Sequence, residues 1–274
     1  MKQMPQRQIA AAVQVARAHG LRHAEPTVLA DGVNTVVRLA PYDVVAKVAA
    51  VTYRVRDDPA AWLARELDLA IRLDRSGLPV TVPSPDLPAQ VHVQDGLAMT
   101  FWRHLPHDRA ATPAPDEAGR LLGELHEALA AVEIDLPLLA PALLDIPAFL
   151  ALAPNDRLSE AYERLAPQAR GHGPIQPLHG DPHPGNLLLG ADGWTWCDPE
   201  DCCSGPRSWD LAALHETTRL NGPAAVRAAA ADVDPDELAV MCELRRLHLT
   251  CWYQLHADER PDVRAEADRR LAEW

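Results

Sequence analysis

Three polar side chains in the second half of the chain have the types and the spacing that phosphoryl transfer needs. Asp181 is followed five residues later by Asn186, and a second carboxylate, Asp198, comes twelve residues after that. In phosphoryl transfer the protein aligns the attacking oxygen, holds metal ions and neutralises developing charge. Asp181 is therefore expected to accept or orient a substrate hydroxyl, while Asn186 and Asp198 offer oxygen ligands to Mg²⁺. The pattern predicts a phosphotransferase centre that uses a nucleotide with magnesium.

The residues around these side chains predict a tight loop followed by a β-hairpin. Two prolines and a glycine within residues 182–185 exclude regular helix or strand, so Asp181 lies on a stiff turn. The apolar run after Asn186, a short turn, and an aromatic and β-branched run are typical of two short paired strands over residues 187–196. Asn186 would precede the first strand and Asp198 would follow the second. We therefore expect all three side chains to reach one site.

The same residues also fit a metal-dependent hydrolase. His179, Asp181 and His183 have the alternating spacing of a hydrolase metal site, in which Asp198 would be a fourth ligand. A proline-rich surface turn with incidental polar residues is a further alternative that fares no better, and a nucleotide-binding module without turnover is another, although every catalytic residue type is present. A hydrolase has no use for Asn186 at this spacing or for the upstream lysine described next. The phosphotransferase is therefore the favoured hypothesis.

One lysine lies in a segment that otherwise has the pattern of a buried strand, residues 44–48. A lysine in such a strand, here Lys47, must be paired with an acid or lie at a functional site. The next predicted helix, residues 62–71, supplies Glu66, and its leucine and isoleucine residues repeat at i, i+4 and i+8. Asp68, on a different face of that helix, is the alternative partner.

The remaining pattern predicts strands early in the chain and mostly helices later. Helices are expected at residues 8–19, 62–71, 116–126, 223–230, 235–256 and 261–273, a less regular helical segment at 145–170, and strands at 27–29, 35–39, 42–48, 90–94 and 97–102. The expected fold class is α+β, with a small antiparallel sheet followed by a helical region.

The composition excludes several classes of protein. With 47% hydrophobic and 24% charged residues, the 274-residue chain is globular rather than disordered. Its net charge of −13 opposes binding to nucleic acids and anionic membranes, and it suits a neutral or cationic small molecule better. Five cysteines without a Cys-x-x-Cys pair indicate reduced thiols. No apolar run is long enough to cross a membrane, so we expect a soluble, cytoplasmic protein. We expect it to be a monomer or a homodimer.

The motif around the first aspartate resembles the catalytic loop of the aminoglycoside phosphotransferase and choline kinase family, small-molecule relatives of the protein kinases. Residues 179–181 (His-Gly-Asp), then Asn186, then Asp198 match the loop and the metal-binding aspartate of that family, and His183 also fits. Downstream, residues 205–212 (GPRSWDLA) resemble the family's Gly-Asp-Pro-x-x-Asp-Leu-Ala segment, with the middle positions varied. The resemblance covers most of the chain in the correct order.

The resemblance implies a protein-kinase-like bilobal fold, with a nucleotide-binding lobe at residues 1–102 and a catalytic and substrate-binding lobe at residues 103–274. ATP or GTP with Mg²⁺ would bind in the cleft and give the γ-phosphoryl group to a hydroxyl of a small molecule. The acceptor would be an aminoglycoside or a related antibiotic, which would connect the protein with antibiotic resistance. A metabolite such as choline, homoserine or a sugar is the alternative acceptor.

The same resemblance implies roles for residues that bind the nucleotide. Lys47, held by Glu66, would reach the α- and β-phosphates and complete the catalytic set. The other residues expected to contact the nucleotide are Gly32 and Asn34 in a turn over the phosphates, Met99, Phe101 and Trp102 at the hinge around the adenine, and Leu188 beneath the purine. The three hinge side chains fit equally well as core of the small lobe.

The remaining expectations concern residues that support the loop or line the acceptor site. His179 and Asp210 would brace the loop, and Asp210 would also cap a helix N-terminus, worth about 1 kcal/mol. Glu200 or Asp201 would either bind a substrate amine or face solvent. The last helices contain further acids for the acceptor site, none of them singled out by spacing: Glu216, Glu243, Asp258 and Glu259.

Overall fold

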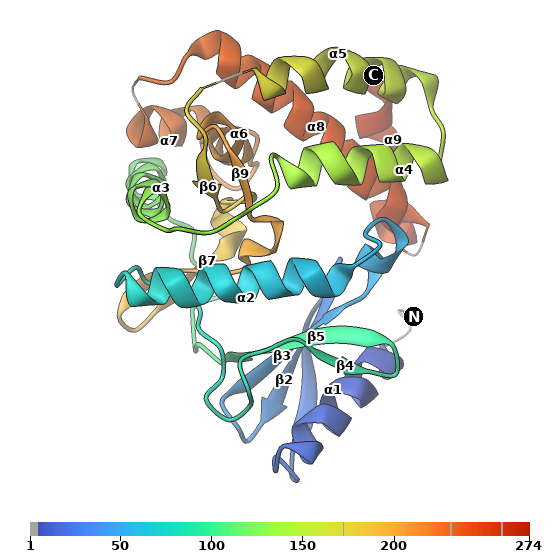
Figure 1. Ribbon diagram of the computed structural model, residues 1–274, viewed down its shortest axis with the longest axis vertical. Coiled ribbons are helices and arrows are strands. Elements are labelled where there is room, and N and C mark those ends of the chain that lie inside the picture. The colour runs from blue at the N-terminus through green and yellow to red at the C-terminus, as the bar shows by residue number, and fades with distance from the viewer. Residues whose placement is uncertain (1–4, 172, 231, 259) are drawn as a thin grey trace. The chain divides into compact units, whose positions relative to one another are not determined.

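The computed structural model describes residues 5–171, 173–230, 232–258 and 260–274, and the chain divides into two compact units (Figure 1). The first unit contains the chain up to Asp108 together with Leu188–Trp196, and the second contains Arg109–Leu187 and Cys197–Trp274. A single lobe boundary after residue 102 stays a prediction. The segment Leu188–Trp196, although it follows the Asp181 loop in sequence, belongs with the first unit.

The first unit is built on an antiparallel sheet of five strands in the order β1-β2-β3-β5-β4. The strands are β1 (Glu25–Asp31), β2 (Asn34–Ala40), β3 (Val44–Ala49), β4 (His92–Gln94) and β5 (Leu97–Arg103). Lys47 of β3 pairs with Val36 of β2 and Thr100 of β5, so it lies in the middle of the sheet. The predicted antiparallel strands and the α+β fold class are confirmed.

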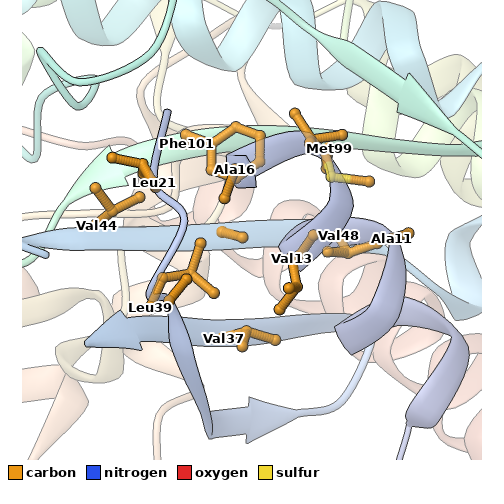
Figure 2. Packing of buried hydrophobic residues seen from close by; sticks show 14 of the residues in the cluster. Ala11, Val13, Ala16, Leu21, Val37, Leu39, Val44, Val48, Met99 and Phe101 are labelled. Atoms are coloured by element: carbon orange, nitrogen blue, oxygen red, sulfur yellow. The ribbon is translucent and has the colours of Figure 1, made fainter. Parts of the chain in front are cut away.

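Helix α1 (Gln6–Ala18) packs on one face of this sheet and buries the main core of the unit (Figure 2). The side chains on this face alternate along each strand, as the period of two requires. They include Val37 and Leu39 of β2, and Met99 and Phe101 of β5, all at most 3% exposed. Their burial against alanine and valine side chains of α1 stabilises the sheet from this side.

Helix α2 (Pro59–Arg75) carries the second layer of the unit. Asp58 caps its N-terminus by accepting a hydrogen bond from the Ala61 N–H at 3.1 Å, and Pro59 fills the first turn. Leu63 of the helix packs in a small cluster with Ala49 of β3 and with Ala98 of β5. Since residues 49 and 98 alternate with those facing α1, α2 covers the other side of the sheet.

A short hairpin completes the first unit. Its strands are β7 (Leu187–Gly190) and β8 (Gly193–Trp196), as the sequence predicts. The backbone of Trp196 forms hydrogen bonds with Pro79 and Thr81, and Asp108 N–H donates to the Leu189 carbonyl at 3.0 Å. These bonds attach the hairpin to the segments on either side of β4 and β5.

The second unit is mainly helical. Its elements are α3 (Pro115–Ala130), α4 (Ile146–Leu152), α5 (Asp156–Arg170), α6 (Ser208–His215), α7 (Gly222–Ala229), α8 (Pro235–Ala257) and α9 (Arg264–Ala272), with two short paired strands, β6 (Gln176–Leu178) and β9 (Cys203–Gly205). Helix α8 contacts α5, α6 and α9, so it is the central helix of the unit.

Two features of the second unit were not predicted from the sequence. The β6 and β9 pair joins the segment before the catalytic loop to the segment after Asp198, and a π-helical turn, Pro141–Asp145, leads into α4. Strands of three residues and single π-turns carry too little periodic pattern to be recognised in a sequence. Within the described residues, the structure has no helix that is both long and apolar enough to cross a membrane.

Candidate active site

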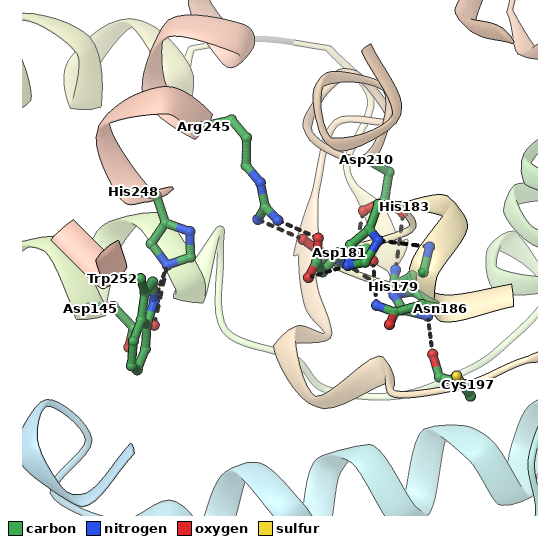
Figure 3. A network of polar contacts seen from close by, with 12 residues as sticks. Asp145, His179, Asp181, His183, Asn186, Cys197, Asp210, Arg245, His248 and Trp252 are labelled. Carbon is green, nitrogen blue, oxygen red and sulfur yellow. Dashed lines mark hydrogen bonds and ion pairs between the residues drawn. The ribbon is translucent and has the colours of Figure 1, made fainter. Parts of the chain in front are cut away.

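Asp181 and Asn186 are joined by a hydrogen bond inside the loop that connects β6 to β7. The side-chain amide of Asn186 donates from Nδ2 to the Asp181 carbonyl at 2.8 Å (Figure 3). Cys197 N–H donates to the Asn186 carbonyl at 2.9 Å, which brings the residue before Asp198 against the loop. The two ends of the hairpin therefore meet at Asn186, as the sequence predicts.

The donor set of this region fits Mg²⁺. Because Nδ2 of Asn186 is used by the Asp181 carbonyl, the amide oxygen Oδ1 is the atom left for a cation. Asp198 adds an exposed carboxylate, and its left-handed backbone, with φ of 62°, starts the turn that follows β8. Oxygen ligands from few protein groups suit a hard cation that keeps several waters.

Asp210 braces the catalytic loop from helix α6. Its carboxylate accepts the backbone N–H of His179 at 3.1 Å and that of Gly180 at 2.9 Å, and it lies 3.2 Å from Nε2 of His126. The predicted capping role is wrong, because α6 begins at Ser208 and Asp210 lies inside the helix. The carboxylate is fully buried and serves loop amides instead of the helix end.

Gly180 lets the loop pass close to the chain that follows the hairpin. Its φ is +88°, and a Cβ atom at this position would lie 1.9 Å from the Asp201 carbonyl oxygen. Only glycine combines this backbone conformation with so close an approach. The residue directly before Asp181 must therefore be glycine for steric reasons.

Both histidines of the alternative hydrolase motif use their ring nitrogens in other ways. His179 donates from Nε2 to the Cys197 carbonyl at 3.1 Å and accepts the Asp181 N–H at Nδ1. Burial lowers the pKa of His179, which keeps the ring neutral in this role. His183 accepts the Gly185 N–H at Nδ1 at 2.9 Å. Nε2 of His183 stays available beside Asp181, but His179 could join a metal site only by giving up one of its two loop contacts, so the geometry disfavours the three-residue hydrolase site.

Arg245 of helix α8 contacts Asp181, and the sequence motifs did not reveal it. Its guanidinium donates to Oδ1 of Asp181 and, at 3.4 Å, to the Gly180 carbonyl. Burial alone raises the pKa of Asp181, but the charge of Arg245, followed by His183 and His179, outweighs it and holds that pKa below its ordinary value. No sequence pattern singled it out, because the burial of Arg245 and His248 on one face of α8 is known only from the tertiary packing.

In the first unit, Lys47 and Glu66 form the predicted ion pair. Nζ lies 2.9 Å from Oε1, and the two residues are 5% and 1% exposed. Asp68, the alternative partner, instead pairs with Arg72 on the exposed side of α2. A buried lysine is tolerated when an acid is paired with it, and binding of nucleotide phosphates by Lys47 stays a prediction.

The predicted hinge residues separate into two groups. Met99 and Phe101 belong to the core on the α1 side of the sheet (Figure 2), whereas Lys47 points to the α2 side. Their side chains are therefore core residues and do not share a face with Lys47, which corrects the adenine prediction for these two. Trp102 lies on the alternate face, where its indole donates to Thr100 at 2.9 Å. Of the three side chains, it alone remains a candidate for the adenine.

The other predicted nucleotide contacts lie at strand ends. Gly32 follows β1, and its N–H donates to the carbonyl of Asn34, the first residue of β2, at 3.0 Å. A Cβ atom on Gly32 would meet nothing within 4 Å, so the turn has open space above it. Leu188 is a half-buried residue of β7. Their nucleotide roles stay predictions.

The acids proposed for the acceptor differ in their surroundings. Glu200 is 7% exposed, so it does not face solvent, whereas Asp201 is half-buried. The acids of the last helices are already engaged: Glu216 pairs with Arg246, Glu243 with Arg164 and Asp258 with Arg264, while Glu259 lies outside the described residues.

Comparisons with known proteins identify the family and the fold. The sequence matches the model of the phosphotransferase enzyme family over residues 36–244. Among solved structures, it resembles the amicoumacin kinase hAmiN in complex with AMP-PNP, Ca²⁺ and Ami, with a TM-score of 0.72, 14% identity, and coverage of 98% of this chain and 94% of that one. The GDP and kanamycin complex of APH(2")-IIia gives a TM-score of 0.69 and 17% identity over 96% and 97% of the two chains.

A third similar structure is the choline kinase LicA from Streptococcus pneumoniae, with a TM-score of 0.63 and 16% identity over 96% of this chain and 99% of that one. No curated protein matches the sequence significantly. The structural neighbours define a protein-kinase-like fold, which confirms the predicted fold class. The chain belongs to the phosphotransferase enzyme family, and the family and its fold together support a small-molecule phosphotransferase.

Proposed function

We propose that this protein transfers the γ-phosphoryl group of ATP or GTP to a hydroxyl of a small molecule. Asp181 orients the acceptor hydroxyl and receives its proton as the bond to phosphorus forms. Lys47, held by Glu66, binds the nucleotide phosphates. Asn186 and Asp198 would hold Mg²⁺, which would offset the negative charge of the nucleotide phosphates.

The observation that carries the proposal is the set of hydrogen bonds by which Asp210 and Asn186 hold the backbone around Asp181. Asp210 holds two consecutive backbone N–H groups before Asp181, and Asn186 holds its carbonyl. This arrangement fixes the backbone of Asp181 from both sides and leaves Oδ1 of Asn186 for the cation. A catalytic group that must align an oxygen for in-line attack needs such a rigid backbone.

The acceptor is the open part of the proposal. The similar solved structures are of an amicoumacin kinase, an APH(2") complex with kanamycin and a choline kinase, so their acceptors span antibiotics and an amino alcohol. We propose an aminoglycoside or related antibiotic first, because a net charge of −13 attracts polycations. Choline, homoserine and sugars form the second group to test.

The proposal is tested by ADP or GDP release with Mg-ATP or Mg-GTP across aminoglycosides, macrolides, amino alcohols and sugars. Asp181→Asn removes the acceptor for the hydroxyl proton, and Asp192→Asn makes the same change on the exposed hairpin turn as a matched control. We expect one acceptor class to stimulate release, Asp181→Asn to lower kcat at least about 100-fold, and Asp192→Asn to match the wild type.

The outcomes separate the alternatives. A slow background release of ADP with water alone would count as non-catalytic if Asp181→Asn leaves it unchanged. If the protein binds nucleotide but no acceptor raises ADP or GDP release above that background, the protein is a non-catalytic module. Activity that needs Zn²⁺ but no nucleotide would revive the hydrolase hypothesis based on His179 and His183.

A further inference from the structure

Arg245 presents a buried guanidinium directly to the loop that carries the catalytic aspartate. Its side chain is 4% exposed and comes from the middle of α8, far from the loop in sequence (Figure 3). One terminal nitrogen donates to Oδ1 of Asp181 and the other to the Gly180 carbonyl at 3.4 Å. The same side chain thus contacts the carboxylate and the backbone just before it.

The position of Arg245 is itself fixed by neighbouring aromatic packing. The guanidinium carbon lies 5.5 Å from the ring centroid of Trp209, which is fully buried in α6 next to Asp210. Trp209 also packs against His248, one turn further along α8. Helix α6 therefore supports the loop twice, through the Asp210 carboxylate and through the ring that holds Arg245.

A buried arginine is costly unless its charge and its donors are satisfied. Here Nε of Arg245 is buried without a hydrogen-bond partner among the described residues, whereas both terminal nitrogens contact the Asp181 loop. What the placement does achieve is contact with Oδ1 of Asp181. Oδ2 lies 3.5 Å from Nε2 of His183, beyond ordinary hydrogen-bond length.

We propose that Arg245 is a positioning residue, which fixes the orientation of the Asp181 carboxylate so that Oδ2 receives the acceptor hydroxyl. This inference rests on the proposed role of Asp181 in phosphoryl transfer. The planar guanidinium contacts Oδ1 and the Gly180 carbonyl together, and two contacts at a fixed angle prevent the carboxylate from rotating. A purely stabilising ion pair would have no such effect on turnover.

The test compares Arg245→Gln and Arg245→Lys with Arg246→Gln, a neighbouring arginine that pairs with Glu216. Steady-state ADP release is measured with Mg-ATP and the acceptor of highest rate, or with water if no acceptor is active. We expect Arg245→Gln to lower kcat about 100-fold, as a misplaced catalytic group does, while KM for ATP stays within about threefold. Arg245→Lys should recover part of the rate, and Arg246→Gln should resemble the wild type.

Crystal structures of the wild type and Arg245→Gln supply a readout that does not depend on activity. We expect the Asp181 carboxylate to take more than one orientation in the variant, while the Asp210 bonds to the loop persist. Arg245→Ala with added guanidinium ions gives a second variant, in which a positioning role predicts recovery of kcat. An Arg245→Gln protein with wild-type kcat and an unmoved Asp181 would overturn the inference.

Failure of the proposed function looks different. If the wild type releases no ADP under any condition, the phosphotransferase proposal fails, yet the crystal structures still decide whether Arg245 orients Asp181. If Arg245→Gln does not fold, the kcat and the crystal structure of Arg245→Lys test the inference instead. A folded lysine variant with full kcat and a displaced carboxylate would show that orientation is not needed for turnover.

Discussion

Asp210 and Lys47 illustrate how this protein uses buried charge at the scale of single residues. Asp210 is satisfied by loop N–H groups, and Lys47 by the acid of another element. Both charges are removed from water, which is unfavourable unless each is paired or hydrogen-bonded. Each pairing holds a buried charge that we assign, directly or through the Asp181 loop, to phosphoryl transfer.

The Lys47 and Glu66 pair gives a prediction that separates stability from nucleotide binding. Glu66→Gln removes the negative charge that lies 2.9 Å from a buried lysine, so we expect the free energy of unfolding to fall by about 3 kcal/mol. The double variant Lys47→Met with Glu66→Leu should recover most of that loss, because two apolar side chains replace two buried charges. Urea unfolding measures both changes.

The double variant should recover its stability but not its affinity for nucleotide. Isothermal titration with Mg-ATP is expected to show weaker binding in the double variant than in the wild type, despite its recovered stability. As a control, Asp68→Asn on the exposed side of the same helix should change neither quantity. Wild-type affinity in the double variant would show that Lys47 does not bind phosphates.

At the scale of elements, the packing of α3 against α7 depends on one glycine. A Cβ atom at Gly119 would lie 2.3 Å from the Ala225 carbonyl, whereas one at Gly123 would meet its nearest atom, the Ala229 carbonyl, at 3.7 Å. Gly119→Ala should therefore push the helices apart and destabilise the protein by about 1 to 3 kcal/mol. Gly123→Ala should stabilise it by up to about 1 kcal/mol through helix propensity.

Thermal unfolding of these two variants tests whether the packing of α3 against α7 requires Gly119, because both variants change a glycine of the same helix. A lower Tm for Gly119→Ala with an equal or higher Tm for Gly123→Ala is the expected result. Equal effects in the same direction would mean that α3 and α7 do not pack as described.

Long and strongly patterned elements were predictable from the sequence. The strand with Lys47, helix α2 with Glu66, and the hairpin between Asn186 and Asp198 follow from periodicity and turn residues, because local sequence decides them. Arg245 and the sheet face of Met99 were not predictable in this way. Which side of a strand meets which helix, and which distant side chain meets Asp181, is decided by tertiary packing that no local pattern records.

At the scale of the whole molecule, the thiols report on how well the second unit is packed, because all five cysteines lie in it. Cys202, Cys203, Cys242 and Cys251 are buried, whereas Cys197 is half-buried. Burial raises the pKa of Cys242 and of Cys251 to about 12. A raised pKa keeps a thiol protonated at pH 8, and the protonated thiol is unreactive.

Labelling with a disulfide reagent at pH 8 should therefore give one fast thiol in the folded protein. Cys197→Ser should remove that fast phase, and labelling in urea should reach all five cysteines. Fast labelling of Cys242 or Cys251 in the folded protein would contradict the packing of α8.

The most direct test of the account is to identify the phosphorylated product. After incubation with Mg-ATP and the acceptor panel, ³¹P NMR and mass spectrometry are applied to the small molecules. We predict a new phosphate monoester on a hydroxyl of one acceptor with the wild type and essentially none with Asp181→Asn. An ester formed equally fast by the Asp181 variant, or none from a wild type that binds nucleotide, would contradict the central claim.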